Sequence, residues 1–220
     1  STLTFNIALQ AVKADNPSSE VIIFHITDLH SGHLPSSILN FIQTHSCNLT
    51  IVTGDLDEGN EAAYASLKAE LDSIGKPYMV LRGNHDFNET AWINVFGMQG
   101  INSTVIGDYL IITFDHIDDY DFNATKVKEI IDANTNKMII WATHGLMTPD
   151  MTYLFHDKGA SSFVMENNSV LVLTGHWHTY YRTFIVGNDG RFIPVYCIDS
   201  TTEENMGYPL HIITLKDGMV

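Results

Sequence analysis

Seven side chains of metal-ligand types follow short apolar runs at five places in this 220-residue sequence. They are Asp28, His30, Asp55, Asn84, His144, His176 and His178. Any one of them alone would be read as a surface or packed side chain, and a Gly-Asp pair alone as a turn. Their joint placement after five apolar runs is what indicates a metal site.

The ligand types restrict the metal. The set contains imidazole, carboxylate and amide donors and no thiolate, which suits manganese, iron or zinc. Seven ligands are too many for one tetrahedral zinc ion, but they fit two divalent ions if one carboxylate bridges them. Two metal ions about 3.5–4 Å apart can hold both the attacking and the leaving oxygen of a phosphoryl transfer. The sequence therefore predicts a binuclear centre.

The apolar runs before these residues predict strands, because they are short and rich in β-branched residues. The expected strands are Val21–Thr27, Leu49–Thr53, Tyr78–Arg82, Tyr109–Phe114, Met138–Thr143 and Val170–Thr174. Helical patterns cover Ser36–Thr44, Glu61–Ile74 and Ala124–Ala133. After residue 180 only strands are expected, at Arg182–Val186, Phe192–Ile198 and Leu210–Leu215, and the turn Gly187-Asn188-Asp189-Gly190 joins the first two as a hairpin.

Alternating strands and helices followed by a meander predict an α/β (α+β) fold with two packed sheets and outer helices. We expect a single domain over residues 1–220. Ligands of such sheets bind beyond the carboxyl ends of the strands, so the five clusters can converge there. Asp28 and His30 are two residues apart, and an extended chain would point both the same way. The same holds for His176 and His178, unless the turn between them rotates one.

The composition excludes some partners. The chain has 26 Asp and Glu against 11 Lys and Arg, a formal charge of −15, which disfavours nucleic acid and anionic membrane surfaces. No run approaches 18 apolar residues, so we expect no membrane span. The two cysteines, Cys47 and Cys197, are expected as free buried thiols in preference to a disulfide bridge. Composition leaves the compartment open, cytoplasmic or extracytoplasmic.

The order of the motifs resembles the calcineurin-like metallophosphoesterase superfamily, nearest its cyclic-nucleotide phosphodiesterase-like branch. The matching motifs are Asp28-Leu29-His30, Gly54-Asp55, Gly83-Asn84-His85-Asp86, His144 and Gly175-His176-Trp177-His178. The resemblance implies a four-layer α-β-β-α sandwich of two mixed β-sheets flanked by helices. Some membrane-anchored relatives share Arg-Gly-Asn-His-Asp followed by Phe-Asn, and this chain starts at Ser1, so an excised domain of a longer membrane-anchored protein is one interpretation.

The resemblance also implies a role for each residue. One metal ion would be held by Asp28, His30, Asp55 and His178, and the other by Asp55, Asn84, His144 and His176, so that Asp55 bridges. A metal-bridging hydroxide would attack phosphorus in line. His85 would protonate or stabilise the leaving oxygen, and Asp86 would orient His85. Many relatives read G-D-x-x-D after the second strand, whereas here the acid stands one place early at Asp57 or is replaced by Glu58.

Two functions from different classes follow. The first is a metal-dependent phosphoesterase that hydrolyses a phosphodiester or a phosphomonoester, with a small-molecule, nucleotide-like substrate favoured. The second is a catalytically weak metal-binding scaffold or interaction module of the same fold. A scaffold predicts missing ligands, and none of the seven is missing, so the enzyme is the favoured hypothesis. His116 also follows an expected strand and is a lesser candidate for substrate contact.

Overall fold

The computed structural model describes residues 20–97, 100–116, 123–145, 160–201 and 210–216. Its strands are β1 (Val21–Ile26), β2 (Leu49–Thr53), β3 (Tyr78–Leu81), β4 (Ile101–Ile106), β5 (Tyr109–Phe114), β6 (Met138–Thr143), β7 (Ser169–Thr174), β8 (Tyr181–Val186), β9 (Phe192–Cys197) and β10 (His211–Leu215). Its helices are α1 (Ser36–Thr44), α2 (Glu61–Ile74), α3 (Glu89–Phe96), α4 (Ala124–Asp132) and α5 (Ala160–Glu166).

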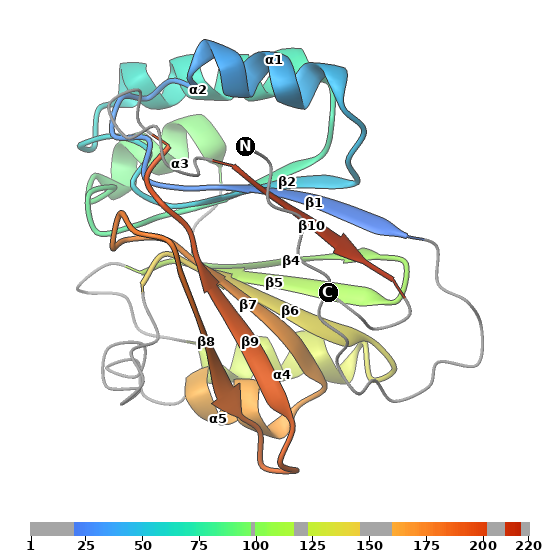
Figure 1. Ribbon diagram of the computed structural model, residues 1–220. Helices are drawn as coiled ribbons and strands as arrows, with labels where there is room; N and C mark the ends of the chain where they lie inside the picture. Colours follow the sequence, from blue (N-terminus) through green and yellow to red (C-terminus); the bar gives the residue numbers. More distant parts are fainter. Residues whose placement is uncertain (1–19, 98–99, 117–122, 146–159, 202–209, 217–220) are drawn as a thin grey trace.

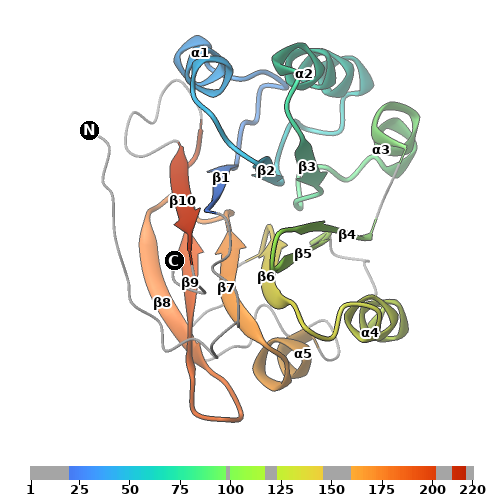
Figure 2. The same ribbon diagram turned by 90° about the vertical axis from the view of Figure 1, so that its right-hand side faces the viewer.

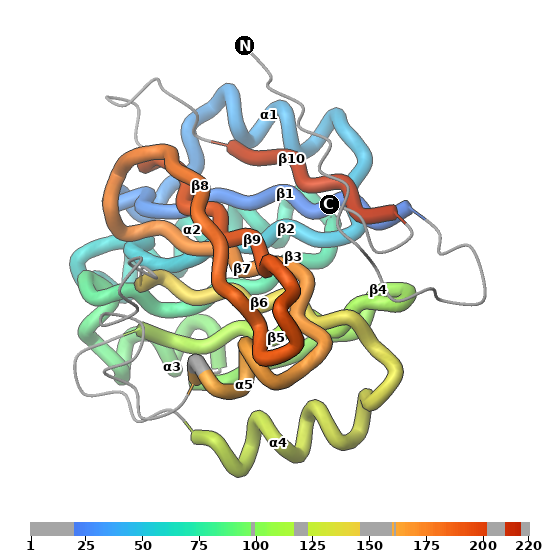
Figure 3. Tube along the Cα trace, turned by 60° about the horizontal axis from the view of Figure 1, so that its bottom comes forward, coloured from blue at the N-terminus to red at the C-terminus, as the bar shows by residue number. Residues whose placement is uncertain are grey.

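The strands form two mixed sheets. One has four strands in the order β10-β1-β2-β3, and the other has six in the order β4-β5-β6-β7-β9-β8. The inner neighbours are parallel, whereas β10, β4 and β8 pair antiparallel with β1, β5 and β9 at the sheet edges. Parallel strands end on the same side, so the segments that follow β1, β6 and β7 gather at one end of the molecule (Figure 3).

The helices and sheets form four layers, and an apolar cluster fills each of the three spaces between them (Figures 1 and 2). Side chains such as Ile23, Ile51, Ile111 and Leu171 fill the space between the sheets. A second cluster packs α1, α2 and α3 on the outer face of the four-stranded sheet, and a third packs α4 and α5 on the six-stranded sheet. The expected four-layer sandwich of two mixed sheets flanked by helices is confirmed.

The differences from the expected elements have local causes. Helix α3 has eight residues, too few for a clear apolar period, and it begins where the Asn88 side chain accepts a hydrogen bond from the Ala91 N–H. Edge strand β4 carries Asn102, Ser103 and Thr104 in its middle, so it lacks the apolar run of the other strands. The expected hairpin is confirmed: β8 and β9 pair antiparallel across the turn, with Val186 opposite Phe192.

Two smaller expectations can also be compared with the structure. Both cysteines are free, as predicted, but only Cys197 is buried and Cys47 is half-buried. Among the described helices none has the length and hydrophobicity needed to cross a membrane.

Candidate metal centre

Backbone hydrogen bonds join four of the five clusters in two pairs, and the N–H groups of His85 and His176 connect the fifth cluster and the two pairs through Asp55 and Asp28. The N–H groups of Asp28 and His30 donate to the carbonyls of Gly54 and Asp55, both at 3.0 Å, so the segments after β1 and β2 continue the parallel pairing. The Gly175 N–H donates to the His144 carbonyl at 3.1 Å, which joins the segments after β7 and β6. The predicted convergence at the carboxyl ends of the strands is therefore confirmed.

The candidate ligands adopt an unfavourable backbone conformation. Among the described residues, five non-glycine residues have positive φ, and all are candidate ligands: Asp28 (52°), His30 (49°), Asp55 (52°), His176 (78°) and His178 (47°). This conformation costs about 1–2 kcal/mol per residue. Such strain collects at functional sites, where the surrounding structure compensates for it. Asp28 and His30 are therefore not in extended backbone, and the alternation of side chains along an extended chain does not apply to them.

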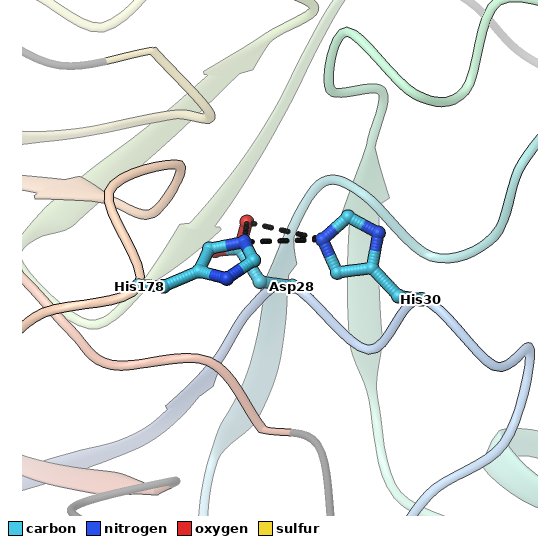
Figure 4. A group of neighbouring side chains, drawn as sticks. All are labelled: Asp28, His30 and His178. Carbon is cyan, nitrogen blue, oxygen red and sulfur yellow. Dashed lines mark hydrogen bonds and ion pairs between the residues drawn. The ribbon is translucent and has the colours of Figure 1, made fainter. Parts of the chain in front are cut away.

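The first ligand group is Asp28, His30 and His178, whose ligand atoms lie within 4.8 Å of one another (Figure 4). Asp28 Oδ2 accepts hydrogen bonds from Thr27 Oγ1 at 2.7 Å and from the His176 N–H at 2.9 Å. These bonds leave Oδ1 facing the rings, 3.1 Å from His178 Nε2 and 3.9 Å from His30 Nε2. The two Nε2 atoms are themselves 3.1 Å apart, so one oxygen and two nitrogens converge.

The second group is Asp55, His144 and His176. His144 Nε2 lies 3.0 Å from Asp55 Oδ2 and 3.2 Å from His176 Nδ1. His144 Nδ1 donates to the Thr53 carbonyl at 2.7 Å, which directs Nε2 into the group. The second nitrogen of a metal-binding histidine commonly makes a bond of this kind, because it fixes the tautomer. His176 and His178 therefore belong to different groups, since the turn rotates one relative to the other.

Asp55 belongs to the second group and also faces the first, and its ligand atom lies within 4.8 Å of those of His30 and His85 as well. Its Oδ2 is 3.0 Å from His144 Nε2 and 3.8 Å from His30 Nε2, while Oδ1 accepts a hydrogen bond from the His85 N–H at 2.9 Å. Burial would raise the pKa of Asp55, but the hydrogen bond and charge of His144 outweigh it and lower the pKa to about 2. A carboxylate that is charged at neutral pH and faces both groups can bridge two cations.

The buried carboxylates of Asp28 and Asp55 favour positive charge at the site. Burial lowers the pKa of His144, yet the hydrogen bond to Asp55 and the charges of Asp28 and Asp55 raise it to about 9. The carboxylates thus stabilise a proton on a buried imidazole, where desolvation alone would remove it. The same carboxylates would attract divalent cations.

Asn84 contributes an unsatisfied acceptor. Its Oδ1 is buried and accepts no hydrogen bond from the described residues. A buried acceptor without a partner costs about 1–3 kcal/mol, which coordination of a cation would offset. The next residue, His85, donates its N–H to Asp55, so Asn84 stands on the segment that touches the shared carboxylate. Together, imidazole nitrogens, carboxylates and an unpaired amide oxygen fit a pair of divalent ions.

His85 and Asp86 lie on different sides of their segment. The His85 ring is half-exposed, edge-on to His30 with ring centres 4.9 Å apart, and its Nδ1 hydrogen-bonds to Glu58 at 2.8 Å. This hydrogen bond raises the pKa of His85. The Asp86 carboxylate is buried and accepts bonds from the N–H groups of Leu56 (3.1 Å) and Gly83 (2.9 Å) and from Tyr64 Oη (3.0 Å).

Asp86 therefore does not orient His85, contrary to the expectation. Its oxygens are occupied by donors of the neighbouring segments, and the carboxylate at His85 is Glu58. Burial raises the pKa of Asp86 to about 7, against the effect of these hydrogen bonds. We infer that Asp86 holds the two ligand-bearing segments together.

The family of the chain follows from its sequence. The family model of the calcineurin-like phosphoesterases matches residues 22–180, which is more than half of the chain and includes every candidate ligand. The chain belongs to this family. A search of curated proteins found no match to this chain.

Solved structures support the fold of this chain. A dimetal phosphatase from Danio rerio superposes with a TM-score of 0.64 at 10% identity, over 82% of this chain and 88% of that one. The protein TT1561 of Thermus thermophilus gives 0.58 at 12% identity, over 90% and 100%. The 5'-nucleotidase of Candida albicans gives 0.51 at 16% identity, over 89% of this chain and 50% of that one. At these identities the likeness concerns the fold alone.

The glycines of the phosphoesterase motifs allow the segments to approach closely. A Cβ atom at Gly83 would lie 2.2 Å from Asp55 Oδ1, and one at Gly54, whose φ is 86°, would lie 2.7 Å from His144 Nδ1. Neither position accepts a side chain unless a candidate ligand moves. The packing of the site thus requires glycine at the first position of both Gly-Asp and Gly-Asn-His-Asp.

Two further residues border the site. The His116 ring lies beside the second group, with centres 6.3 Å from His144 and 6.0 Å from His176. Glu58 contacts both His85 and His30, the latter at 3.4 Å. The sequence indicated Glu58 only as a substitute for an acid common in relatives. Its pairing with His85 depends on how the segments after β2 and β3 pack, which spacing does not reveal.

Proposed function

We propose that this phosphoesterase hydrolyses small phosphoesters, with a nucleotide-like substrate favoured, at a centre of two divalent ions. Manganese, iron and zinc fit the donor set. The observation that carries the proposal is the position of Asp55, whose Oδ2 lies 3.8 Å from His30 Nε2 of one group and 3.0 Å from His144 Nε2 of the other. A single structural ion would not need two such groups.

In this proposal the ligands divide as the two groups do. Asp28, His30 and His178 would hold one ion with Asp55, and Asn84, His144 and His176 would hold the other with Asp55. The five positive φ values support the role of these residues as ligands, because strain found only at candidate ligands among the described non-glycine residues is expected where ligand geometry outweighs backbone preference.

When bound, two ions would activate a water molecule and neutralise charge on the phosphoryl group. The protein side chains supply the remaining steps. His85 would donate a proton to the leaving oxygen, since its ring is half-exposed at the edge of the centre. Glu58 would keep that ring oriented and protonated, because its hydrogen bond raises the pKa of His85. Asp86 and Tyr64 would hold the segment that carries Asn84 and His85.

The surroundings favour small substrates over polymers. The described segments at the strand ends, 27–35, 54–60, 82–88, 115–116, 144–145, 175–180 and 198–201, contain one Lys or Arg, which is Arg82. Arg82 is buried, and its Nε is 2.8 Å from Asp115 Oδ2. Binding along a nucleic-acid backbone requires a row of exposed cations, which these segments do not supply.

The test is hydrolysis of p-nitrophenyl phosphate and its bis ester by protein purified without chelators and supplied with manganese, iron or zinc. We expect turnover that a chelator abolishes and metal restores, and the ratio of the two rates separates monoesterase from diesterase. Asp55→Asn should lose turnover, whereas Asp132→Asn, an exposed acid on α4, should keep it. Stoichiometric metal without turnover of either ester would instead identify a metal-binding scaffold.

A further inference from the structure

Trp177 is exposed beside the metal centre. The chain has three tryptophans, and Trp92 and Trp141 are buried, at 1% and 0% exposure, whereas Trp177 is 48% exposed. Burial of an aromatic side chain contributes about 1.5–3 kcal/mol relative to exposure, so the exposed indole forgoes stabilisation that the other two gain. An exposed indole beside a ligand site can gain this stabilisation when it packs against a bound molecule.

The backbone fixes Trp177 relative to the centre. It stands between His176 and His178, which belong to the two different ligand groups and both have positive φ. Its N–H donates to the Gly175 carbonyl at 3.0 Å, and its ring lies edge-to-face with the His176 ring, with centres 5.8 Å apart. The indole is therefore held next to a candidate ligand on a constrained turn, and not on a flexible tip.

The rest of the rim suits an uncharged group. Phe87, which is 65% exposed, follows the Asn84-His85-Asp86 segment and is the second exposed aromatic ring next to candidate site residues. The strand-end segments offer no exposed Lys or Arg in the described part of the chain, and Glu58 adds negative charge. A substrate group bearing carboxylates or further phosphates would meet no exposed Lys or Arg side chain in these described segments, whereas a flat ring can stack on an indole whatever its hydrogen-bonding pattern.

We propose that Trp177 stacks on a planar, uncharged aromatic group in the organic part of the phosphoester, and so selects substrates that carry such a ring. This inference rests on the proposed phosphoesterase function. The ring could be an aryl group next to the ester oxygen or a nucleobase one sugar away from it. Both sources share the flat π-face that stacking requires.

The first experiment measures binding without turnover. Zinc-loaded protein is titrated with benzylphosphonate and with cyclohexylmethylphosphonate, which match in charge and size but differ in aromaticity. Tryptophan fluorescence reports the result, because Trp177 is the one exposed tryptophan of the chain. Subtraction of the Trp177→Phe spectrum isolates the Trp177 signal. We expect quenching by the aromatic phosphonate at about tenfold lower concentration than by the aliphatic one.

The second experiment measures hydrolysis of adenosine 5'-monophosphate and ribose 5-phosphate, in both of which the ester oxygen is the primary 5'-oxygen of a ribose, and only the first of which carries a base. A nucleobase site predicts a KM about tenfold lower for the nucleotide, with similar kcat. Trp177→Ala should remove this preference and Trp177→Phe should retain part of it. Phe184→Ala, which removes an exposed ring from the β8–β9 hairpin, is the matched control and should retain all of it.

The outcomes separate the two proposals. Quenching of Trp177 at lower concentration by the aromatic phosphonate, or a lower KM for the nucleotide that Trp177→Ala abolishes, supports the inference, and the pair that shows it identifies the source of the ring. Equal binding within both pairs, or a preference that survives Trp177→Ala, overturns it. Absence of turnover with every ester contradicts the phosphoesterase function, and the fluorescence titration still decides whether Trp177 meets a ring.

Discussion

At the scale of single residues, the centre consists of acceptors that face one another. Imidazole nitrogens meet at 3.1 and 3.2 Å, two carboxylates lie beside them, and the Asn84 amide oxygen is buried without a donor. The types and spacing of these residues predict seven metal ligands, and the structure brings the ligand atoms of six of them together in two groups. The role of Glu58 was not predictable, because its contact with His85 depends on how the segments after β2 and β3 pack against each other.

The hydrogen bond between Glu58 and His85 leads to a prediction about turnover. Glu58→Gln should lower kcat by about 10- to 100-fold, since the imidazole loses a negative partner that orients and charges it. His85→Asn should lower it by about 10²–10⁴-fold, the usual contribution of a general acid. Both losses should be largest for esters with poor leaving groups, while metal content stays at the wild-type level.

Glu129→Gln, at an exposed position on α4, provides the control and should leave kcat unchanged. Loss of metal from His85→Asn would show that His85 is a ligand and not an acid. Unchanged kcat in Glu58→Gln would remove Glu58 from the reaction.

At the scale of elements, the buried carboxylate of Asp86 ties together the segments after β2 and β3 and helix α2. It accepts from Leu56, Gly83 and Tyr64, which come from these three places. The sequence suggested a role for Asp86 from motif order, and that role was wrong for a physical reason. Neighbours in sequence can point in opposite directions when the chain turns between them.

Asp86→Asn should destabilise the protein by about 1–3 kcal/mol, because the amide N–H₂ would face a donor that the carboxylate now satisfies. Tyr64→Phe removes one of the bonds and should cost about 1 kcal/mol. Urea unfolding of metal-free protein measures both. An Asp86→Asn variant as stable as the wild type would contradict the structural role. A loss of kcat larger than the loss of stability, both expressed as free energies, would assign Asp86 a role in the reaction.

At the scale of the whole molecule, the two sheets and their outer helices were predictable, and some elements were not. Apolar runs indicated the parallel strands because these are covered on both faces. Strand β4 lies at an edge and is half polar, and α3 is short, so neither has a strong period. The pairing of distant strands could be learned only from the structure. For example, β10, which follows all the other strands in the sequence, pairs with β1, which precedes them.

The pairing of β1 with β10 makes stability depend on pH. It places His25 opposite His211, and burial lowers the pKa of His25 and lowers that of His211 to about 4. Between pH ~6.5 and ~4 the unfolded chain binds protons that the folded chain does not, so stability falls as pH falls through this window. The His211 contribution should be on the order of 2 kcal/mol.

The measurement is urea unfolding of metal-free protein at pH values from 7 to 4, wild type against His211→Gln. The variant should show a shallower loss of stability with acid, whereas His45→Gln, at an exposed position, should follow the wild type. Parallel curves for wild type and His211→Gln would contradict the account of this pair.

The central claim is that Asp55 bridges two metal ions, and the most direct test is anomalous scattering from crystals grown with manganese or zinc. The account predicts two peaks about 3.5–4 Å apart. Asp55 should lie between them, Asp28, His30 and His178 around one, and Asn84, His144 and His176 around the other. A single peak, or two peaks of which only one contacts Asp55, would contradict it.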